Sequence, residues 1–374
     1  MKLIVTLMLL SFQMSHLFSA EAFIYAGSYA KGEKAKGIHL LKFNLENGNL
    51  SLVSSEFSGE NPSFLALHPN KKFLYAVNES GNRGDEDGGT LSAFQIDPNT
   101  GSLKLLNKKF TQGSWPCHLS LTKNGEMIAV ANYGGGSVIS YAIEKDGRLS
   151  QSKSYIKNHG SSINKKRQES AHAHSFNFLF NDTLALSADL GIDKIVAYNV
   201  HKNKAELTLN EEATISMKAG HGPRHIAFSQ NEKNLYVINE LTAVISSFIF
   251  NETDKKYNLV TEKSTLPKDY TGKKSTAEIV LHPNGQFLYG SNRGHDSIVV
   301  FNVFENGEMT KVQTTSVEGK TPRNFTISPD GKWVLVAHQD SNSIRVFSLN
   351  PTTGKLTLTD NQVSIPKPVC LIFK

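Results

Sequence analysis

The segment LYAVNES at residues 74–80 reveals an internal repeat, because variants of it recur along the whole chain. The variants are IYAGSYA (24–30), IAVANYG (128–134), LALSADL (184–190), LYVINEL (235–241), LYGSNRG (288–294) and VLVAHQD (334–340). The polar residue that closes each stretch recurs about every 52 residues, at Ser28, Asn78, Asn132, Asp189, Asn239, Asn292 and His338. Seven repeats of this length fit seven blades of four strands.

Each repeat carries β signals throughout. A short apolar run such as PSFLAL (62–67) comes first, then a turn signal such as HPNKK (68–72), then the closing stretch, then a further apolar run such as TLSAFQI (90–96). Short runs rich in Val, Ile, Phe and Tyr between Asn, Gly and Pro clusters are typical of strands and hairpins. Outside the first twenty residues no window has a sustained helical period, so we expect an all-β chain.

The two ends of the chain predict a closed ring. The first repeat lacks its opening strand, and the chain ends in KPVCLIF (367–373), which has the pattern of that missing strand. Joining the two partial repeats makes one complete blade and removes exposed sheet edges. We therefore predict a seven-bladed β-propeller whose closing blade is shared by both termini. The alternative is a linear solenoid, which would leave both partial units uncapped.

The first twenty residues have the pattern of a secretory signal peptide. Lys2, an apolar core and small residues at the end of the segment favour cleavage after Ala20 or Ala22. We predict a signal at 1–20, a propeller domain at 21–374, and export to the periplasm or the medium without a membrane span in the remaining chain. An uncleaved anchor is the alternative.

Composition excludes several functions. The net charge is +6, but the basic residues are scattered apart from NKKRQ (164–168), and no aromatic residues alternate with them, so we expect no nucleic-acid partner. We interpret NKKRQ as a solvated loop, with anion steering as the alternative. No His or Cys ligands have a zinc spacing, so no metal and no cofactor are expected. Cys117 and Cys370 fall two blades apart and are read as buried thiols.

Two positions of the repeat should converge on one rim of the central channel. In an antiparallel hairpin the start of the first strand and the end of the second lie at the same edge. After the proline-led position come Ser63, Cys117, His174, Arg224, Ala277, Arg323 and Val369; after the closing residue come Tyr29, Glu79, Tyr133, Leu190, Glu240, Arg293 and Gln339. A polar patch on one side of a symmetric scaffold predicts a small-molecule site.

The candidate catalytic residues are Glu240, His174 and Arg224. A carboxylate or imidazole can take a proton, and guanidinium groups suit a carboxylate or phosphate. The substrate-binding candidates are Arg293, Arg323, Asn239, Asn292 and His172. The structural alternative is that Arg224 and Glu240 form a salt bridge within one hairpin. His225 and His118 are expected to be packing histidines.

Three segments resemble the seven-bladed lactonase family, which includes 6-phosphogluconolactonases and carboxymuconate-lactonizing enzymes. They are GHGPRHIAFSQNEKNLYVINEL (220–241), HPNGQFLYGSNRGHDSIVVF (282–301) and TPRNFTISPDGKWVLVAHQDSNSIRVF (321–347). Residues that match the family's proposed active site are His174, Arg224, Glu240 and Arg293, with Arg323 in the following PR motif.

The resemblance implies metal-independent chemistry on a small anionic lactone. In a hydrolase, water attacks the ring carbonyl, Glu240 or His174 accepts its proton, and the arginines hold the anion and the oxyanion. In a lactonizing cyclase, the arginines hold the carboxylates of a muconate. Hydrolysis like that of a 6-phosphogluconolactonase is the first expectation, although an exported enzyme would meet unphosphorylated lactones more readily. A non-enzymatic exported binding platform is the third hypothesis. The sequence does not indicate an oligomeric state.

Overall fold

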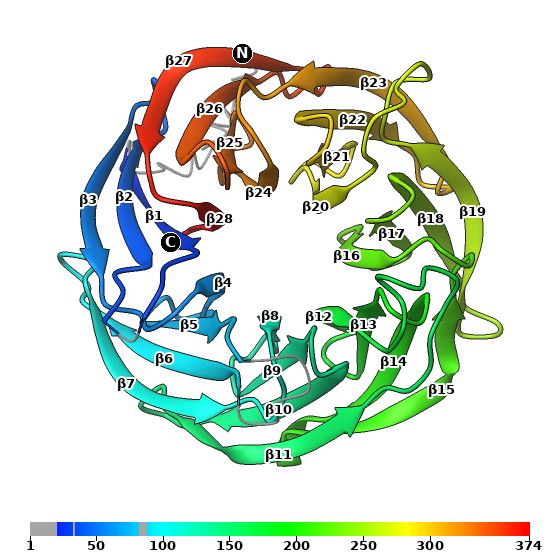
Figure 1. The fold of residues 1–374 in the computed structure, drawn as a ribbon, viewed down its shortest axis with the longest axis horizontal. Coiled ribbons are helices and arrows are strands. Elements are labelled where there is room, and N and C mark those ends of the chain that lie inside the picture. The colour runs from blue at the N-terminus through cyan, green and yellow to red at the C-terminus, as the bar shows by residue number, and fades with distance from the viewer. Residues whose placement is uncertain (1–20, 33, 82–87) are drawn as a thin grey trace, which may run out of the picture.

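The computed structural model describes residues 21–32, 34–81 and 88–374, so the predicted signal peptide at 1–20 lies outside the described residues. Within these ranges the chain forms seven four-stranded antiparallel sheets and one short 3-10 helix, η1 (Lys202–Lys204). The sheets stand around a central axis as the blades of a ring (Figure 1). The predicted all-β, seven-bladed propeller is confirmed. In the same ranges no helix has the length and hydropathy that a membrane crossing requires.

Each blade runs from an innermost strand at the channel to an outermost strand at the periphery. In that order the closing blade is β28 (Pro368–Phe373), β1 (Glu21–Ser28), β2 (Ile38–Asn44) and β3 (Leu50–Glu56); the second is β4 (Pro62–Leu67), β5 (Phe73–Asn78), β6 (Thr90–Ile96) and β7 (Leu103–Phe110); the third is β8 (Pro116–Leu121), β9 (Met127–Asn132), β10 (Ser137–Ile143) and β11 (Leu149–Lys157); the fourth is β12 (Ala173–Leu179), β13 (Leu184–Asp189), β14 (Lys194–His201) and β15 (Glu206–Ser216).

The remaining three blades follow the same order. The fifth is β16 (Pro223–Phe228), β17 (Asn234–Asn239), β18 (Val244–Asn251) and β19 (Lys256–Ser264); the sixth is β20 (Thr276–Leu281), β21 (Phe287–Asn292), β22 (Ser297–Val303) and β23 (Met309–Ser316); the seventh is β24 (Pro322–Ile327), β25 (Trp333–His338), β26 (Ser343–Leu349) and β27 (Leu356–Ser364).

The ring closes by pairing the two ends of the chain. The last strand, β28, is antiparallel to β1, with Ile24 opposite Phe373 and Gly27 opposite Cys370. In Figure 1 the red β28 and the blue β1 lie side by side at the channel. The shared closing blade predicted from the partial repeats is therefore confirmed, and this pairing protects an edge that each terminus would otherwise leave open.

Apolar side chains fill the space between neighbouring blades. Buried residues form one hydrophobic cluster for each pair of adjacent blades, for example between β5 and β9, where Tyr75, Val77 and Val130 meet. Tyr75 also donates its hydroxyl to the carbonyl of Gly147, in the outer turn of the next blade, at 3.0 Å. Tyr25 and Tyr289 make the same bond to Gly101 and Gly354. The tyrosine of the repeat thus ties successive blades together.

Candidate functional site

Each innermost strand carries one extra residue directly after its first position. In β16, Pro223 lies opposite Asn239 and His225 opposite Ile238, which leaves Arg224 outside the pairing. The same register shift occurs in all seven blades, at Ser63, Cys117, His174, Arg224, Ala277 with Glu278, Arg323 and Val369. Such a bulge redirects a side chain. Arg224 accordingly reaches the next blade, where its Nη1 donates to the carbonyl of Ala277 at 2.7 Å.

Glu240 is the centre of the polar cluster at this rim. Its side chain is 4 % exposed and faces three guanidinium groups: Arg167 Nη2 at 2.7 Å, Arg293 Nη2 at 2.9 Å and Arg224 Nε at 3.3 Å. Arg224 Nε is not aligned to form a hydrogen bond with the carboxylate. Arg293 is held in turn by two bonds from Nε and Nη2 to the carbonyl of Thr276. The Arg224–Glu240 salt bridge, which was the structural alternative for these two residues, is thus one of three ion pairs between Glu240 and an arginine of the described chain.

The arginines keep Glu240 ionised. Burial alone would raise the pKa of this carboxyl, but Arg293, Arg167 and Arg224 outweigh burial and hold its pKa well below the usual range. Burial, together with the charges of Arg293 and Arg323, lowers the pKa of Arg224 to about 10. That guanidinium still carries its charge at neutral pH. The cluster is therefore fully charged, and Glu240 is a weak base.

A second polar group lies at the same rim. The guanidinium carbon of Arg323 lies 5.3 Å from the ring centre of Tyr29, and the Tyr29 hydroxyl donates to Glu79 Oε2 at 2.9 Å. Although burial lowers the pKa of Arg323, Tyr29, Glu79 and Glu240 raise it above its ordinary value. We call Arg167, Arg224, Glu240, Arg293 and Arg323, with His174, the rim layer. Its four guanidinium groups face the carboxylates of Glu240 and Glu79, which leaves an excess of positive charge for an anion.

His174 lies beside Glu240 and is uncharged at neutral pH. Its Nε2 is 3.9 Å from Glu240 Oε2, and its Nδ1 is 3.7 Å from the sulfur of Cys117. Burial and the charge of Arg224 lower the pKa of His174 well below the ordinary histidine value. The structure thus brings together five sequence-predicted residues, His174, Arg224, Glu240, Arg293 and Arg323.

His172 lies next to the cluster but is fully engaged. Its Nδ1 donates to the carbonyl of Tyr133 at 2.8 Å, its Nε2 is 3.2 Å from Glu169, and its ring stacks on that of Tyr133 at 4.5 Å. The Tyr133 hydroxyl accepts a hydrogen bond from Arg167. The place of His172 is therefore behind Tyr133, as a support for the residue that holds Arg167.

The structure does not bring the amides of Asn239 and Asn292 to the arginines. Asn239 Nδ2 donates to Ser246 Oγ at 2.9 Å and to the carbonyl of Val244, in the neighbouring strand of its own blade. The amide of Asn292 donates to Ser297 Oγ and accepts from the hydroxyl of Thr265. Both side chains are fully buried. They stabilise hairpin ends and offer no amide donor to a substrate.

Arg167 is the rim residue that sequence analysis placed elsewhere. It belongs to NKKRQ (164–168), in the connection between β11 and β12, which we interpreted as a solvated loop. Instead its guanidinium reaches Glu240 and Tyr133. Anion steering, the alternative for this segment, agrees better with a position of Arg167 at the rim. The sequence could not predict that position, because the insertion has no counterpart in the other repeats.

One residue deeper along the innermost strands lies a second group, the imidazole layer, which consists of His118, His225, Glu278 and Asn324. His225 Nδ1 is 2.8 Å from Glu278 Oε1, and Asn324 Nδ2 donates to Glu278 Oε2 at 2.5 Å. We expected His225 to be a packing histidine, but the bulge at Arg224 turns the side chains of both Arg224 and His225 towards the sixth blade. Glu278 is not among the residues predicted from the sequence, because the repeat register selects Ala277 and Glu278 is the next residue.

The imidazole layer borders a cavity of about 500 Å³ on the side away from the arginines. His118, Glu278 and Asn324 line its inner end, and Leu67 and Lys123 its outer end. Cys370 lies in its wall, and both cysteines are buried and unpaired as predicted. Among the described residues no group of three His, Cys, Asp or Glu side chains is arranged to hold a metal ion.

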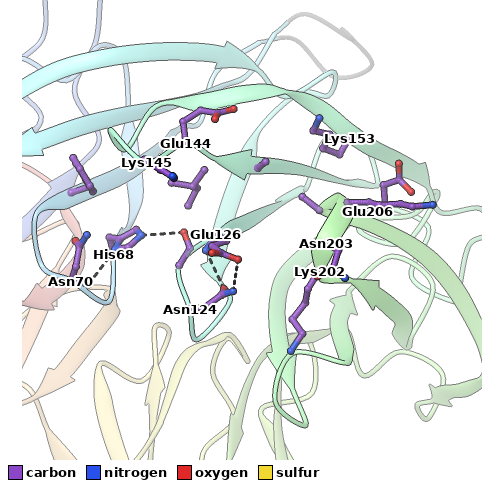
Figure 2. A pocket seen from close by; sticks show the side chains of 16 residues that line it. His68, Asn70, Asn124, Glu126, Glu144, Lys145, Lys153, Lys202, Asn203 and Glu206 are labelled. Atoms are coloured by element: carbon purple, nitrogen blue, oxygen red, sulfur yellow. Dashed lines mark hydrogen bonds between the residues drawn. The ribbon is translucent and has the colours of Figure 1, made fainter.

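A larger cavity, of about 850 Å³, is lined mainly by turns between strands of the second, third and fourth blades (Figure 2). Most of the charged residues that line it are exposed, among them Glu126, Glu144, Lys145 and Lys153. Figure 2 shows them spread along its border instead of meeting at one point. Solvated charges of mixed sign bind a ligand weakly, so the candidate active site is the rim layer.

Comparison with known proteins places the chain among propeller enzymes. A family model described as lactonase, 7-bladed beta-propeller, matches residues 23–373. A 6-phosphogluconolactonase of Bacillus subtilis is 33 % identical over 350 residues, which cover 93 % of this chain and 97 % of the relative. A 6-phosphogluconolactonase of Formosa agariphila is 38 % identical over 338 residues, covering 89 % and 94 %. The solved structure of the Pseudomonas aeruginosa periplasmic gluconolactonase is 30 % identical, with a TM-score of 0.86, and covers 94 % and 99 %.

Proposed function

The chain belongs to the seven-bladed β-propeller lactonase family and is a lactone-hydrolysing enzyme, and we propose that its substrate is an anionic sugar lactone of the 6-phosphogluconolactone type. The observation that carries the proposal is the rim layer, where four guanidinium groups face two carboxylates. Guanidinium groups bind phosphate and carboxylate oxygens in pairs. An excess of them at the channel rim therefore fits a lactone that carries its own negative charge.

The reaction begins when the arginines hold the anion of the substrate. Water then attacks the ring carbonyl carbon, and the negative charge that develops on the carbonyl oxygen is stabilised by the fixed guanidinium groups. Arg224 and Arg293 suit this role because bonds to Ala277 and Thr276 fix their orientation. A group that is already oriented needs no reorganisation during the reaction.

Glu240 orients the arginines instead of accepting the proton of the attacking water. Its carboxylate is shared by Arg167, Arg224 and Arg293, and these charges hold its pKa far below neutrality. A strong proton acceptor needs a pKa close to the working pH. The proton therefore passes to an uncharged imidazole; the rim layer offers His174, and the imidazole layer offers His118 and His225.

Unphosphorylated gluconolactone is the second candidate substrate, and it would be the expected substrate if the chain is exported. Two observations favour it. The solved relative from Pseudomonas aeruginosa is a periplasmic gluconolactonase, and residues 1–20 have the pattern of a secretory signal. An enzyme outside the cytoplasm would meet unphosphorylated lactones more readily than phosphorylated ones.

The test measures lactone opening by the purified chain on 6-phosphogluconolactone, gluconolactone and a muconolactone, each corrected for spontaneous hydrolysis. We expect acceleration well above the buffer rate on a sugar lactone, with a lower KM for the phosphorylated one. A preference for gluconolactone would select the second candidate, and activity on the muconolactone alone would select the cyclase chemistry. No acceleration on any of the three would overturn the enzymatic function in favour of a binding platform.

A further inference from the structure

The imidazole layer contains a carboxylate and an imidazole joined as in an acid–base pair. His225 Nδ1 lies 2.8 Å from Glu278 Oε1, which also accepts the backbone N–H of Ile279 at 3.0 Å. The other carboxylate oxygen accepts from Asn324 at 2.5 Å. Both oxygens of Glu278 are thus fixed from two blades, and the orientation of His225 is fixed with them.

These bonds determine which nitrogen of His225 is basic. Burial raises the pKa of Glu278, but His225 and Arg224 together with the Ile279 amide bring it below its usual value, so the carboxyl is ionised and can only accept. Nδ1 must then carry the hydrogen, and Nε2 has a lone pair. Nε2 is buried and has no hydrogen-bond partner among the described residues. A buried lone pair of this kind favours a water molecule or a hydroxyl group as its partner.

The other two imidazoles near the axis are less suited to accept a proton. His118 Nδ1 accepts the backbone N–H of Phe176 at 3.2 Å, so its Nε2 carries a hydrogen and can only donate. His174 has Glu240 as its nearest carboxylate, at 3.9 Å, but that carboxylate is shared by three guanidinium groups. Of these three histidines, His225 alone is hydrogen-bonded to a carboxylate that, among the residues the structure describes, forms no ion pair with an arginine. That carboxylate, Glu278, can therefore stabilise His225 when the imidazole is protonated.

His225 lies directly beneath the arginines. It follows Arg224 in β16, and its ring centre is 5.4 Å from that of His174 and 5.1 Å from that of His118. The titratable and charged groups that face it are His118 from β8, His174 from β12, Arg224 from β16, Glu278 from β20 and Arg323 from β24. Burial lowers the pKa of His225, Glu278 raises it and Arg224 lowers it, and the net shift is downward. The imidazole is uncharged at neutral pH.

We propose that His225 is the general base of the lactone hydrolysis and that Glu278 is its positioning residue, an inference that rests on the proposed function. His225 Nε2 removes a proton from water while the water oxygen bonds to the ring carbonyl carbon and the carbonyl oxygen takes the negative charge. When the carbonyl re-forms, the bond from carbon to the ring oxygen breaks, and His225 returns the proton to that oxygen as it becomes an alcohol. The new carboxylic acid releases its proton to solvent.

The first test replaces His225 by Asn, and replaces His118 by Asn as the matched control. General-base catalysis contributes about 10² or more in rate, so His225→Asn should lower kcat by roughly that factor with little change in KM. In wild-type protein kcat should fall at acidic pH as His225 becomes protonated, and we call this part of the pH profile the acid limb. The acid limb should disappear in His225→Asn. His118→Asn should keep kcat within about threefold, because general-base catalysis needs a lone pair that His118 does not present. Thermal unfolding and circular dichroism check that both variants are folded.

The second test uses Glu278→Gln, which keeps the size of the side chain and its bond to Asn324. Loss of the negative charge lowers the pKa of His225 further, so the acid limb of the profile should move to lower pH. We expect the plateau of kcat to fall roughly tenfold, because the imidazolium loses its counter-ion. A merely structural Glu278 would change stability without moving this limb.

The outcomes separate this inference from the proposed function. If wild-type protein opens a lactone and both His225→Asn and Glu278→Gln keep its rate and acid limb, the base assignment is wrong and the lactonase function stands. If His225→Asn does not fold, an unchanged acid limb in Glu278→Gln overturns the assignment by itself. If the wild-type chain accelerates no lactone, the proposed function and the base assignment fail together.

Discussion

Where the rim layer lies on the innermost strands, the imidazole layer follows one residue later, as His225 follows Arg224 in β16. The main polar groups of the two layers differ. In the rim layer Arg224 and Arg293 are charged, and each pairs with the carboxylate of Glu240. His118 and His225, directly below, are uncharged, and Glu278 is the carboxylate paired with His225. Fixed charge binds and stabilises anions, whereas a neutral imidazole can gain and lose a proton. On the proposed mechanism, one bulge per strand separates the groups that bind an anion from the group that transfers a proton within a single channel.

The largest expected effect comes from Glu240→Gln, which removes the carboxylate that pairs directly with Arg224. The guanidinium of Arg224 is 3 % exposed and would be left buried without that counter-ion. Breaking a buried ion pair costs about 3–5 kcal/mol, so the free energy of unfolding in urea should fall by that amount at pH 7. The matched control is Asp146→Asn, which breaks the exposed Arg148–Asp146 pair and should cost less than about 1 kcal/mol.

The pH dependence of this loss follows from the sign of the shift. The pKa of Glu240 is lower in the folded chain than its usual 4.5. The stabilisation is therefore fully present above that value and is lost as the pH falls towards the folded pKa. The difference in stability between wild-type protein and Glu240→Gln should shrink below about pH 4.5. A difference that stays constant down to about pH 3 would contradict an ionised Glu240.

Arg293→Lys tests whether the rim layer needs planar, oriented groups. Lysine keeps the positive charge but cannot make the two bonds from Arg293 to the Thr276 carbonyl while pairing with Glu240. Loss of one fixed donor to an oxyanion costs about 10² in rate, so kcat/KM should fall by about that factor. Arg148→Lys, at the surface, should change nothing. Equal activity of Arg293→Lys would mean that charge alone suffices.

The repeat made most of the fold and part of the site predictable. Because each closing residue lies at a strand end, positions such as Arg224, Glu240, Arg293 and Arg323 had to meet at one rim once the ring was inferred. The orphan strand at 367–373 likewise predicted the closing blade, which the pairing of β28 with β1 confirms. The sequence repeat therefore predicts the positions in the fold of those residues that occupy the same place in each repeat.

What does not recur could not be predicted in the same way. Arg167 comes from an insertion, so no register assigned it to Glu240. Glu278 and His225 meet because bulges change the direction of side chains in β16 and β20, and strict alternation along a strand does not predict that change. Asn239 occupies the right register, but its amide is bonded within its own blade. A register position predicts where a residue lies, whereas its hydrogen bonds decide what it can do.

Arg323→Gln should sharpen the distinction between substrates. Within the described part of the chain Arg323 stacks on Tyr29 and forms no direct ion pair, so its charge is available to an anion. We expect KM for 6-phosphogluconolactone to rise about tenfold and KM for gluconolactone to change less than about threefold. Assays on both lactones with the same preparation supply the comparison. An equal rise in KM for both would assign Arg323 to the part of the lactone that the two substrates share.

The smallest effect is expected from Arg167→Ala. Arg167 is 41 % exposed and bonds Glu240 from the connection between β11 and β12, whereas Arg224 and Arg293 belong to the blades. An exposed partner contributes about 1 kcal/mol or less, so kcat/KM should fall only about threefold and the unfolding free energy should barely change. Because salt screens exposed charges, this loss should diminish at high ionic strength, and the neighbouring exposed Lys166→Ala should show none. A loss as large as that of Arg293→Lys, insensitive to salt, would instead make Arg167 an integral member of the buried cluster and the insertion a required wall of the site.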